Sequence, residues 1–96
     1  NMVETINDIL EGYEKIYLTI DLDVLDPAFA PAVQNPEPEG LDTPTLLDLL
    51  EAVCDSRVVG FDLVEVAPHY DRGVTATQAA KTLFEVLCYL ERARTS

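Results

Sequence analysis

The sequence predicts an α/β fold in which helices cover a parallel sheet. Helical and strand-like patterns alternate along the chain in the order helix, strand, helix, strand, helix. This alternation is typical of parallel strands joined by crossover helices. Both strand patterns are apolar at successive positions, which favours strands buried on both faces. Because two strands alone would leave long unpaired edges, we expect the chain to form one end of a larger α/β domain.

The first half of the chain predicts a helix, a strand and a long loop. Apolar residues recur at helical spacing over residues 2–12, and Gly12 can end that helix. The β-branched and aromatic run at residues 16–20 predicts a strand. Residues 24–42 contain four prolines and therefore predict a stiff loop, whose length is typical of functional loops.

The second half predicts a helix, a strand and a closing helix. Thr43 is expected to cap the first of these helices, with Pro44 at its first position. Residues 58–66 predict the second strand, and Thr75 with Gln78 resembles a capping box that opens the last helix. The side chains expected to face the core from the two helices are Leu46, Leu47, Leu50, Val53, Cys54, Ala79, Ala80, Leu83, Phe84, Leu87 and Leu90.

Composition excludes several classes of protein. The 96 residues carry 18 Asp+Glu against 6 Lys+Arg, a formal net charge of -12, which disfavours nucleic acids and anionic membranes as partners. No apolar run is long enough for a transmembrane helix, and the start lacks a signal-peptide pattern. Cys54 and Cys88 are interpreted as small core residues in a reducing compartment. The helical pattern that begins at Met2 suggests a start inside a longer chain.

Three aspartates follow the first strand. Asp21 and Asp23 are two residues apart, so on an extended backbone their side chains point the same way. Their place at the carboxyl end of a strand suits a ligand site, and paired carboxylates suit Mg²⁺, Mn²⁺ or Ca²⁺. The alternative is that they cap the strand end and accept hydrogen bonds from loop amides. Asp26 precedes a proline, and we interpret it as a turn residue.

The second strand carries another carboxylate among apolar neighbours. Glu65 lies between Val64 and Val66, where a buried charge requires a cationic partner such as a guanidinium or ammonium group. By strand alternation Asp62 lies on the opposite face, and we interpret it as structural, bonding loop amides. His69, the only histidine, is interpreted as a solvated or structural loop residue.

Residues 19–31 and 60–68 together resemble the ureohydrolase superfamily of arginase, agmatinase and formimidoylglutamase. The first segment, T-I-D-L-D-V-L-D-P-A-F-A-P, is similar to the late metal motif S-x-D-x-D-x-x-D-P of that family. The second, G-F-D-L-V-E-V-A-P, is similar to the family stretch that ends in an acidic residue and a proline. The resemblance covers essentially the whole chain and is greatest for agmatinase.

The resemblance implies a three-layer α/β/α fold with a mainly parallel sheet. Residues 1–96 would be the carboxyl-terminal part of a single ureohydrolase domain, incomplete alone, with about two strands and three helices. Asp21 and Asp23 would be ligands of a binuclear Mn²⁺ centre, Asp21 bridging both ions, and Glu65 would bind the substrate guanidinium. No certain catalytic residue lies in this chain. The implied reaction is hydrolysis of a guanidino carbon–nitrogen bond, with agmatine giving putrescine and urea.

The resemblance also implies a cytoplasmic homo-oligomer of polyamine metabolism that binds a small cationic guanidino substrate, and neither nucleic acid nor membrane. The family's remaining ligands, a histidine and an Asp-x-His-x-Asp group, would lie upstream, so this chain alone should be inactive. One departure is the segment 31–40, P-A-V-Q-N-P-E-P-E-G, which replaces a glycine-rich family stretch. The loss of those glycines removes positions that easily adopt a positive φ.

Other functions remain open at the level of sequence. Arginase or formimidoylglutamase activity would use the same fold. A haloacid-dehalogenase-type phosphatase also places Asp-x-Asp after an apolar strand, although Pro27 and a missing Gly-Asp-x-x-x-Asp pair disfavour it. A calcium-binding or scaffold module is a further alternative, although Asp21, Asp23 and Asp26 do not have EF-hand spacing. The last alternative is a non-catalytic remnant that provides an oligomer contact.

Overall fold

The structure, a computed structural model, describes residues 2–33, 36 and 38–95. Its elements are, in order, α1 (Met2–Leu10), β1 (Ile16–Asp21), the 3₁₀ turn η1 (Leu22–Val24), α2 (Thr43–Val53), β2 (Val58–Val64), the 3₁₀ turn η2 (Pro68–Tyr70) and α3 (Val74–Thr95). The α/β class and the order of helices and strands predicted from the sequence are confirmed. The main helix bounds differ slightly, since α1 ends at Leu10 and not at Gly12.

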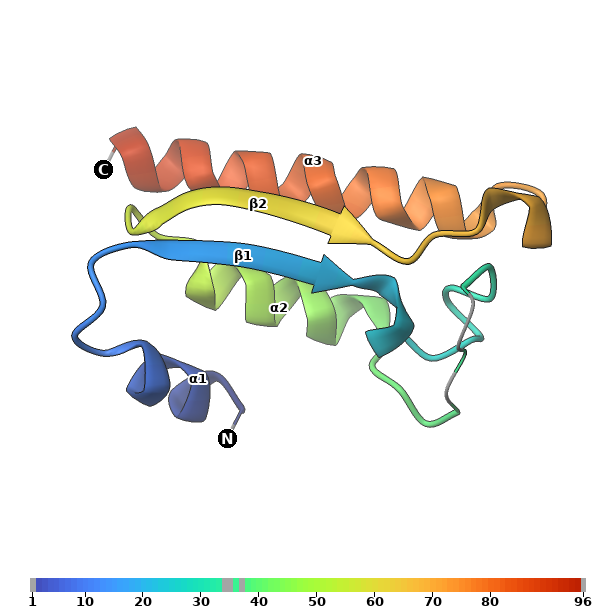
Figure 1. Cartoon of the computed structure of the whole chain (residues 1–96), viewed down its shortest axis with the longest axis horizontal. Helices are drawn as coiled ribbons and strands as arrows, with labels where there is room; N and C mark the ends of the chain where they lie inside the picture. Colours follow the sequence, from blue (N-terminus) through green and yellow to red (C-terminus); the bar gives the residue numbers. More distant parts are fainter. Residues whose placement is uncertain (1, 34–35, 37, 96) are drawn as a thin grey trace.

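The two strands form a parallel pair, and α2 lies on the crossover between them (Figure 1). Thr19 pairs with Asp62, and Asp21 pairs with Val64. A register shift after Ile16 places Tyr17 opposite Gly60. Because the pair is parallel and the last residues are in register, both strands end at the same edge of the sheet.

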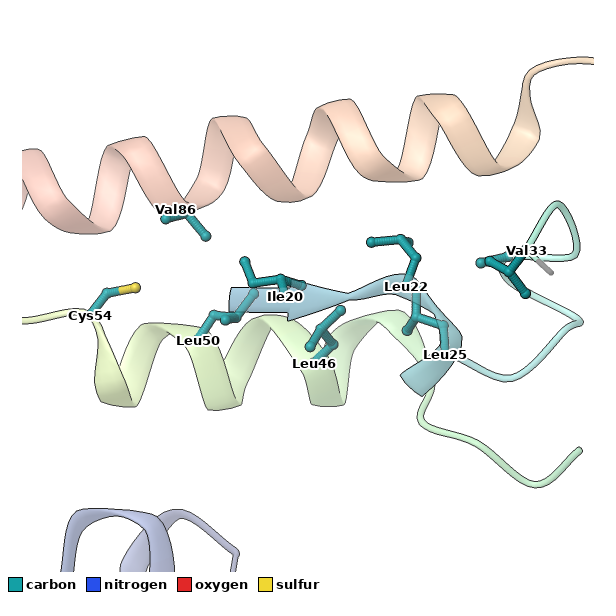
Figure 2. Close-up of a cluster of buried hydrophobic side chains, with 9 residues drawn as sticks. Ile20, Leu22, Leu25, Val33, Leu46, Leu50, Cys54 and Val86 are labelled. Carbon is teal, nitrogen blue, oxygen red and sulfur yellow. The ribbon is translucent and has the colours of Figure 1, made fainter. Parts of the chain in front are cut away.

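One face of the sheet carries the hydrophobic core. Leu18 and Ile20 of β1 lie on this face beside their partners Phe61 and Leu63 of β2. Figure 2 shows core side chains of α2 and α3 meeting around β1. The buried cluster consists of Ile20, Leu22, Leu25, Ala30, Val33, Leu46, Leu50, Cys54 and Val86. Both longer helices therefore pack on the same face.

The other face of the sheet is open in the part of the chain that the structure describes, which corrects the expectation of strands buried on both faces. Tyr17 is 61% exposed on this face, and Thr19 is also exposed. The helices α2 and α3 both belong to the opposite layer, so the described residues form two layers of the expected three.

The helix starts and the outer face of α3 differ from the sequence prediction. Asp42, not Thr43, caps α2 by accepting a hydrogen bond from the amide of Thr45 at 2.8 Å. On α3, Phe84 and Leu87 are 62% and 55% exposed. Ala79 is buried, as expected, whereas Ala80 is exposed and Leu83 and Leu90 are half-buried. The other buried side chains of α3 are Thr75, Thr82 and Val86. The apolar residues of α3 surround the helix, so the pattern alone could not select the packed face.

The two cysteines occupy different environments. Cys54 is buried at the end of α2, as expected, and burial raises its pKa to about 11. Cys88 is exposed on α3, so the expectation of a core residue is wrong for it. Among the described residues, none of the helices is long and apolar enough to cross a membrane.

Candidate active site

The acidic residues singled out from the sequence lie at the carboxyl end of the sheet. Asp21 is the last residue of β1 and pairs in register with Val64, the last residue of β2. Glu65 directly follows Val64. Figure 1 shows the connections that follow β1 and β2 gathered at this end of the molecule. In α/β sheets this edge is where ligands bind, so the topology brings Asp21, Asp23 and Glu65 to a suitable place.

Asp21 and Asp23 are held together by a local turn. The Asp21 Oδ1 atom accepts a hydrogen bond from the Asp23 amide at 2.8 Å, which caps η1. Asp23 thus lies on a 3₁₀ turn, not on the extended backbone that the sequence predicted. Asp21 is exposed and Asp23 is half-buried. Asp21 therefore accepts a hydrogen bond from a loop amide, which is the structural role given above as the alternative to metal binding. This hydrogen bond does not prevent Asp21 from also binding a cation.

The chemistry of this pair fits part of a metal site. An ionised carboxylate accepts at about four positions, so one amide leaves Asp21 able to bind a cation. Carboxylate oxygens are the ligands that hard divalent cations such as Mg²⁺ and Mn²⁺ prefer. Within residues 2–33, 36 and 38–95, no group of three or more His, Cys, Asp or Glu side chains could hold a metal ion. The pair can therefore supply two ligands, and other ligands must come from outside these residues.

Glu65 has a backbone conformation that the sequence did not predict. The strand ends at Val64 and not at Val66, and Glu65, the next residue, adopts φ 68°, which is not a strand conformation. Side-chain-bearing residues adopt this left-handed region at a cost of order 1–3 kcal/mol. Glu65 is exposed. Because it lies beyond the end of β2, the strand alternation that the sequence predicted between Asp62 and Glu65 does not apply to it. Strain of this kind is common at functional sites.

The long loop after β1 is closed at its base by backbone hydrogen bonds. The Asp26 amide donates to Leu41 O at 2.8 Å, and the Leu41 amide donates to Val24 O at 2.9 Å. The Asp26 carboxylate accepts from the amides of Ala28 and Glu39, both at 2.9 Å, which confirms its role as a turn residue. Residues 34, 35 and 37 of the departing segment lie outside the described residues.

A second junction joins the loop to the start of α3. Ala32 is fully buried; its amide donates to Thr75 Oγ1 at 2.8 Å, and its carbonyl accepts from the Ala67 amide at 2.7 Å. The Thr75 hydroxyl donates to Asp71 Oδ2 at 2.8 Å, and the Asp71 carboxylate also accepts from the Gly73 amide at 2.9 Å. The amide of Gly73, followed by other hydrogen bonds, lowers the pKa of Asp71. Asp71 therefore does the capping that the sequence assigned to Thr75.

These junctions place two segments around the acidic edge. The chain before Asp26 is tied to Leu41, and the chain after Glu65 is tied to Ala32 through the Ala67 amide and the Thr75 hydroxyl. The sequence missed Ala32 and Asp71, because a buried alanine in a loop has no distinctive pattern and the Asp71–Gly73 segment suggested only a turn. His69 is exposed, as expected.

Asp62 is structural, as expected, but its partners are not loop amides. Its Oδ1 accepts from Thr19 Oγ1 at 2.5 Å, and its Oδ2 accepts from Tyr17 Oη at 3.0 Å. The hydrogen bond to Asp62 raises the pKa of Tyr17. These three side chains lie on the open face of the sheet, on the amino-terminal side of Asp21 and Glu65.

Comparison with known proteins identifies the family. Residues 1–89 match the arginase family, and the chain therefore belongs to the arginase family. The human mitochondrial guanidino acid hydrolase is 45% identical over 85 residues, which is 88% of this chain and 24% of that protein. The agmatinase of Cronobacter sakazakii is 40% identical over 96 residues, covering 94% of this chain and 31% of that protein.

Solved structures agree with this assignment. A hypothetical agmatinase from Burkholderia thailandensis superposes with a TM-score of 0.89 at 36% identity, covering 99% of this chain and 30% of that one. Proclavaminate amidinohydrolase from Streptomyces clavuligerus gives 0.87 at 40% identity, covering 96% of this chain and 31% of that one. The chain thus spans 24–31% of the length of these relatives.

Proposed function

We propose that residues 1–96 form the carboxyl-terminal part of a single ureohydrolase domain that hydrolyses a guanidino carbon–nitrogen bond. The proposed substrate is agmatine, which would give putrescine and urea. The observation that carries the proposal is the placement of Asp21, Asp23 and Glu65 at one edge of a parallel sheet in a chain of the arginase family. Agmatinase and amidinohydrolase names among its relatives support the choice of a guanidino substrate.

Each acidic residue has a proposed role. Asp21 and Asp23 would hold a binuclear Mn²⁺ centre together with ligands from outside this chain. The ions, when bound, would supply water activated for attack at neutral pH. Glu65 would pair with the planar guanidinium and orient it, since charge-assisted pairing fixes both position and angle.

The overall reaction balances without any further reactant. Water adds its oxygen to the guanidinium carbon, the bond from that carbon to the alkyl nitrogen breaks, and both protons of the water end on the leaving nitrogen. The products are urea and a protonated amine. No residue of this chain is assigned the proton transfer.

The test is an assay of the full-length protein in which this sequence occurs. We expect urea release from agmatine that is lost on treatment with a chelator and restored by Mn²⁺. Parallel assays that measure urea from arginine and guanidino acids, and formamide from formimidoylglutamate, distinguish the activities possible on this fold. Urea released from arginine alone would change the assigned activity from agmatinase to arginase. No urea from agmatine, arginine or guanidino acids would refute the proposal. Family membership leaves the haloacid-dehalogenase alternative without support.

The metal role of Asp23 has its own test. Replacing Asp23 by Ala should lower kcat/KM at least about a hundredfold and weaken Mn²⁺ binding, with unchanged cooperative unfolding. The matched control is Asp8→Ala, because Asp8 is an exposed carboxylate on α1, remote from the sheet edge. Full activity and Mn²⁺ affinity in Asp23→Ala would exclude Asp23 as a ligand.

The remaining expectations concern the complete enzyme. We propose a cytoplasmic homo-oligomer whose partner is a small cationic guanidino compound, and which binds neither nucleic acid nor membrane. The net charge of -12 supports the last two points, because such a surface repels polyanions. Light scattering of the purified full-length protein measures the oligomeric state.

A further inference from the structure

A hydrogen-bonded group on the open sheet face connects the two strands just before the acidic edge. Asp62 of β2 accepts from the hydroxyls of Thr19 and Tyr17, both on β1. Thr19 is the in-register partner of Asp62, and Tyr17 pairs with Gly60. One carboxylate therefore receives hydrogen bonds from two successive side chains on the same face of the neighbouring strand.

The ring of Tyr17 has a defined position over β2. A Cβ atom added to Gly60 would lie 3.1 Å from Cε2 and 3.2 Å from Cδ2 of Tyr17. Gly60 thus gives the ring the space that it needs to lie across β2 and reach Asp62. Two independent observations, the hydrogen bonds and the close approach to Gly60, show that this arrangement is specific.

The contacts of this group differ from those that hold the proposed metal ligands. Asp21 is the last residue of β1 and Asp23 lies on η1. The hydrogen bond from the Asp23 amide to Asp21 Oδ1 joins them and is local to one segment. Glu65 directly follows the other strand, β2, three residues beyond Asp62. The position of Glu65 relative to Asp21 thus depends on how β1 and β2 are held together, whereas the spacing of Asp21 and Asp23 does not.

We propose that Tyr17, Thr19 and Asp62 are positioning residues that fix Glu65 relative to the metal-binding carboxylates. This inference rests on the proposed function, because it needs a substrate cation at Glu65. Loss of one hydroxyl leaves the Asp62 carboxylate less restrained and lets β2 shift against β1. Substrate affinity should then fall while metal affinity stays the same, which a general loss of folded protein would not produce.

The experiment uses the full-length protein with Tyr17→Phe, Thr19→Val and Thr19→Ser. Tyr17→Phe and Thr19→Val each remove one hydroxyl and keep side chains that suit a strand. Each should raise the KM for agmatine about tenfold, the effect of losing one hydrogen bond to a charged group, with kcat changed less than about threefold. Thr19→Ser keeps the hydroxyl and should retain the wild-type KM.

Metal binding supplies the readout that does not depend on activity. The Kd for Mn²⁺, measured by calorimetry on the metal-free protein, should stay within about twofold of wild type in all variants. Tyr13→Phe is the matched control, because Tyr13 is 63% exposed and lies before β1.

The outcomes separate the two proposals. An unchanged KM in both hydroxyl-deleted variants, or a parallel loss of Mn²⁺ affinity, would overturn the positioning role while leaving agmatine hydrolysis standing. A wild-type protein that releases no urea from agmatine would refute the proposed function, and this inference with it. A raised KM with unchanged Mn²⁺ affinity and rescue by Thr19→Ser would establish it.

Discussion

Glu65 combines a strained backbone conformation with a carboxylate at the carboxyl edge of the sheet. Its φ of 68° lies in the region favoured by glycine, and its carboxylate lies at the ligand-binding edge of the sheet. A glycine there would relieve the strain, but it would remove the negative charge. We infer that the strain persists because the side chain is required.

Two substitutions at this residue separate stability from activity. Glu65→Gly should raise the free energy of unfolding by up to about 1 kcal/mol and abolish guanidino hydrolysis, because it removes strain and charge together. Glu65→Gln keeps a side chain at the positive φ and removes only the charge. It should lower kcat/KM about a hundredfold, with unchanged stability. Urea unfolding and urea-release assays on the full-length protein measure both effects. Retained activity in Glu65→Gly would show that the carboxylate is not needed.

Residue identities were more predictable than their conformations. Asp21, Asp23 and Glu65 stood out because charged groups at the ends of apolar strands require an explanation. The sequence V-E-V continues strand alternation, so nothing in it indicated the left-handed turn at Glu65. Asp62 was assigned a structural role correctly, but its hydroxyl partners come from a strand about 43 residues earlier and could only be found in the folded chain.

At the scale of elements, the loop after β1 depends on one close approach. A Cβ atom on Gly40 would lie 2.8 Å from Asp26 N and 2.8 Å from Val24 O, both backbone atoms. These atoms belong to the base of the loop, where Leu25 bridges to Leu41. A side chain at residue 40 would therefore push apart the hydrogen bonds that close the loop.

Gly40→Ala should destabilise the full-length protein by about 1–3 kcal/mol, the usual effect of forcing an atom into a packed site. Because Asp23 belongs to the turn that contacts Gly40, Mn²⁺ affinity should fall as well. Gly12→Ala is the control: its positive φ is strained for alanine, but no atom lies within 4 Å of the added Cβ. Chemical unfolding and calorimetry measure the two effects. Equal losses of Mn²⁺ affinity in both variants would contradict a specific role of the loop base.

Helix ends were predicted to within about two residues, although their caps were not. Asp42, one residue before the expected cap Thr43, accepts the hydrogen bond from the Thr45 amide. At the start of α3, Thr75 is buried. Its hydroxyl accepts a hydrogen bond from the Ala32 amide and donates one to Asp71, so it does not cap the helix. Local capping patterns cannot show such long-range demands.

On the scale of the whole molecule, the described residues leave much apolar surface uncovered. The large apolar side chains that are more than half exposed include Ile9, Tyr17, Val59, Phe84 and Leu87. They lie on α1, on the strands and on α3, so more than one layer is incomplete. The length of the relatives, of which this chain spans 24–31%, agrees with that surface being covered in a complete domain.

Residues 1–96 expressed alone should therefore bind 8-anilinonaphthalene-1-sulfonate strongly and self-associate as concentration rises. Exposed apolar patches of this kind bind such dyes and promote aggregation. The full-length protein at equal molar concentration is the control and should give weak dye fluorescence. A monomeric, dye-silent fragment in sedimentation and fluorescence measurements would show that this surface is tolerated in water.

The parallel pairing of β1 with β2 also has a kinetic consequence. Thr19 and Asp62 are 43 residues apart, so their contact requires closure of a long segment that includes α2. Closing such a segment loses chain entropy before any strand contact forms, and non-local pairings of this kind fold slowly. We therefore expect the pairing of β1 with β2, and with it the sheet edge that carries Asp21 and Glu65, to form late in folding.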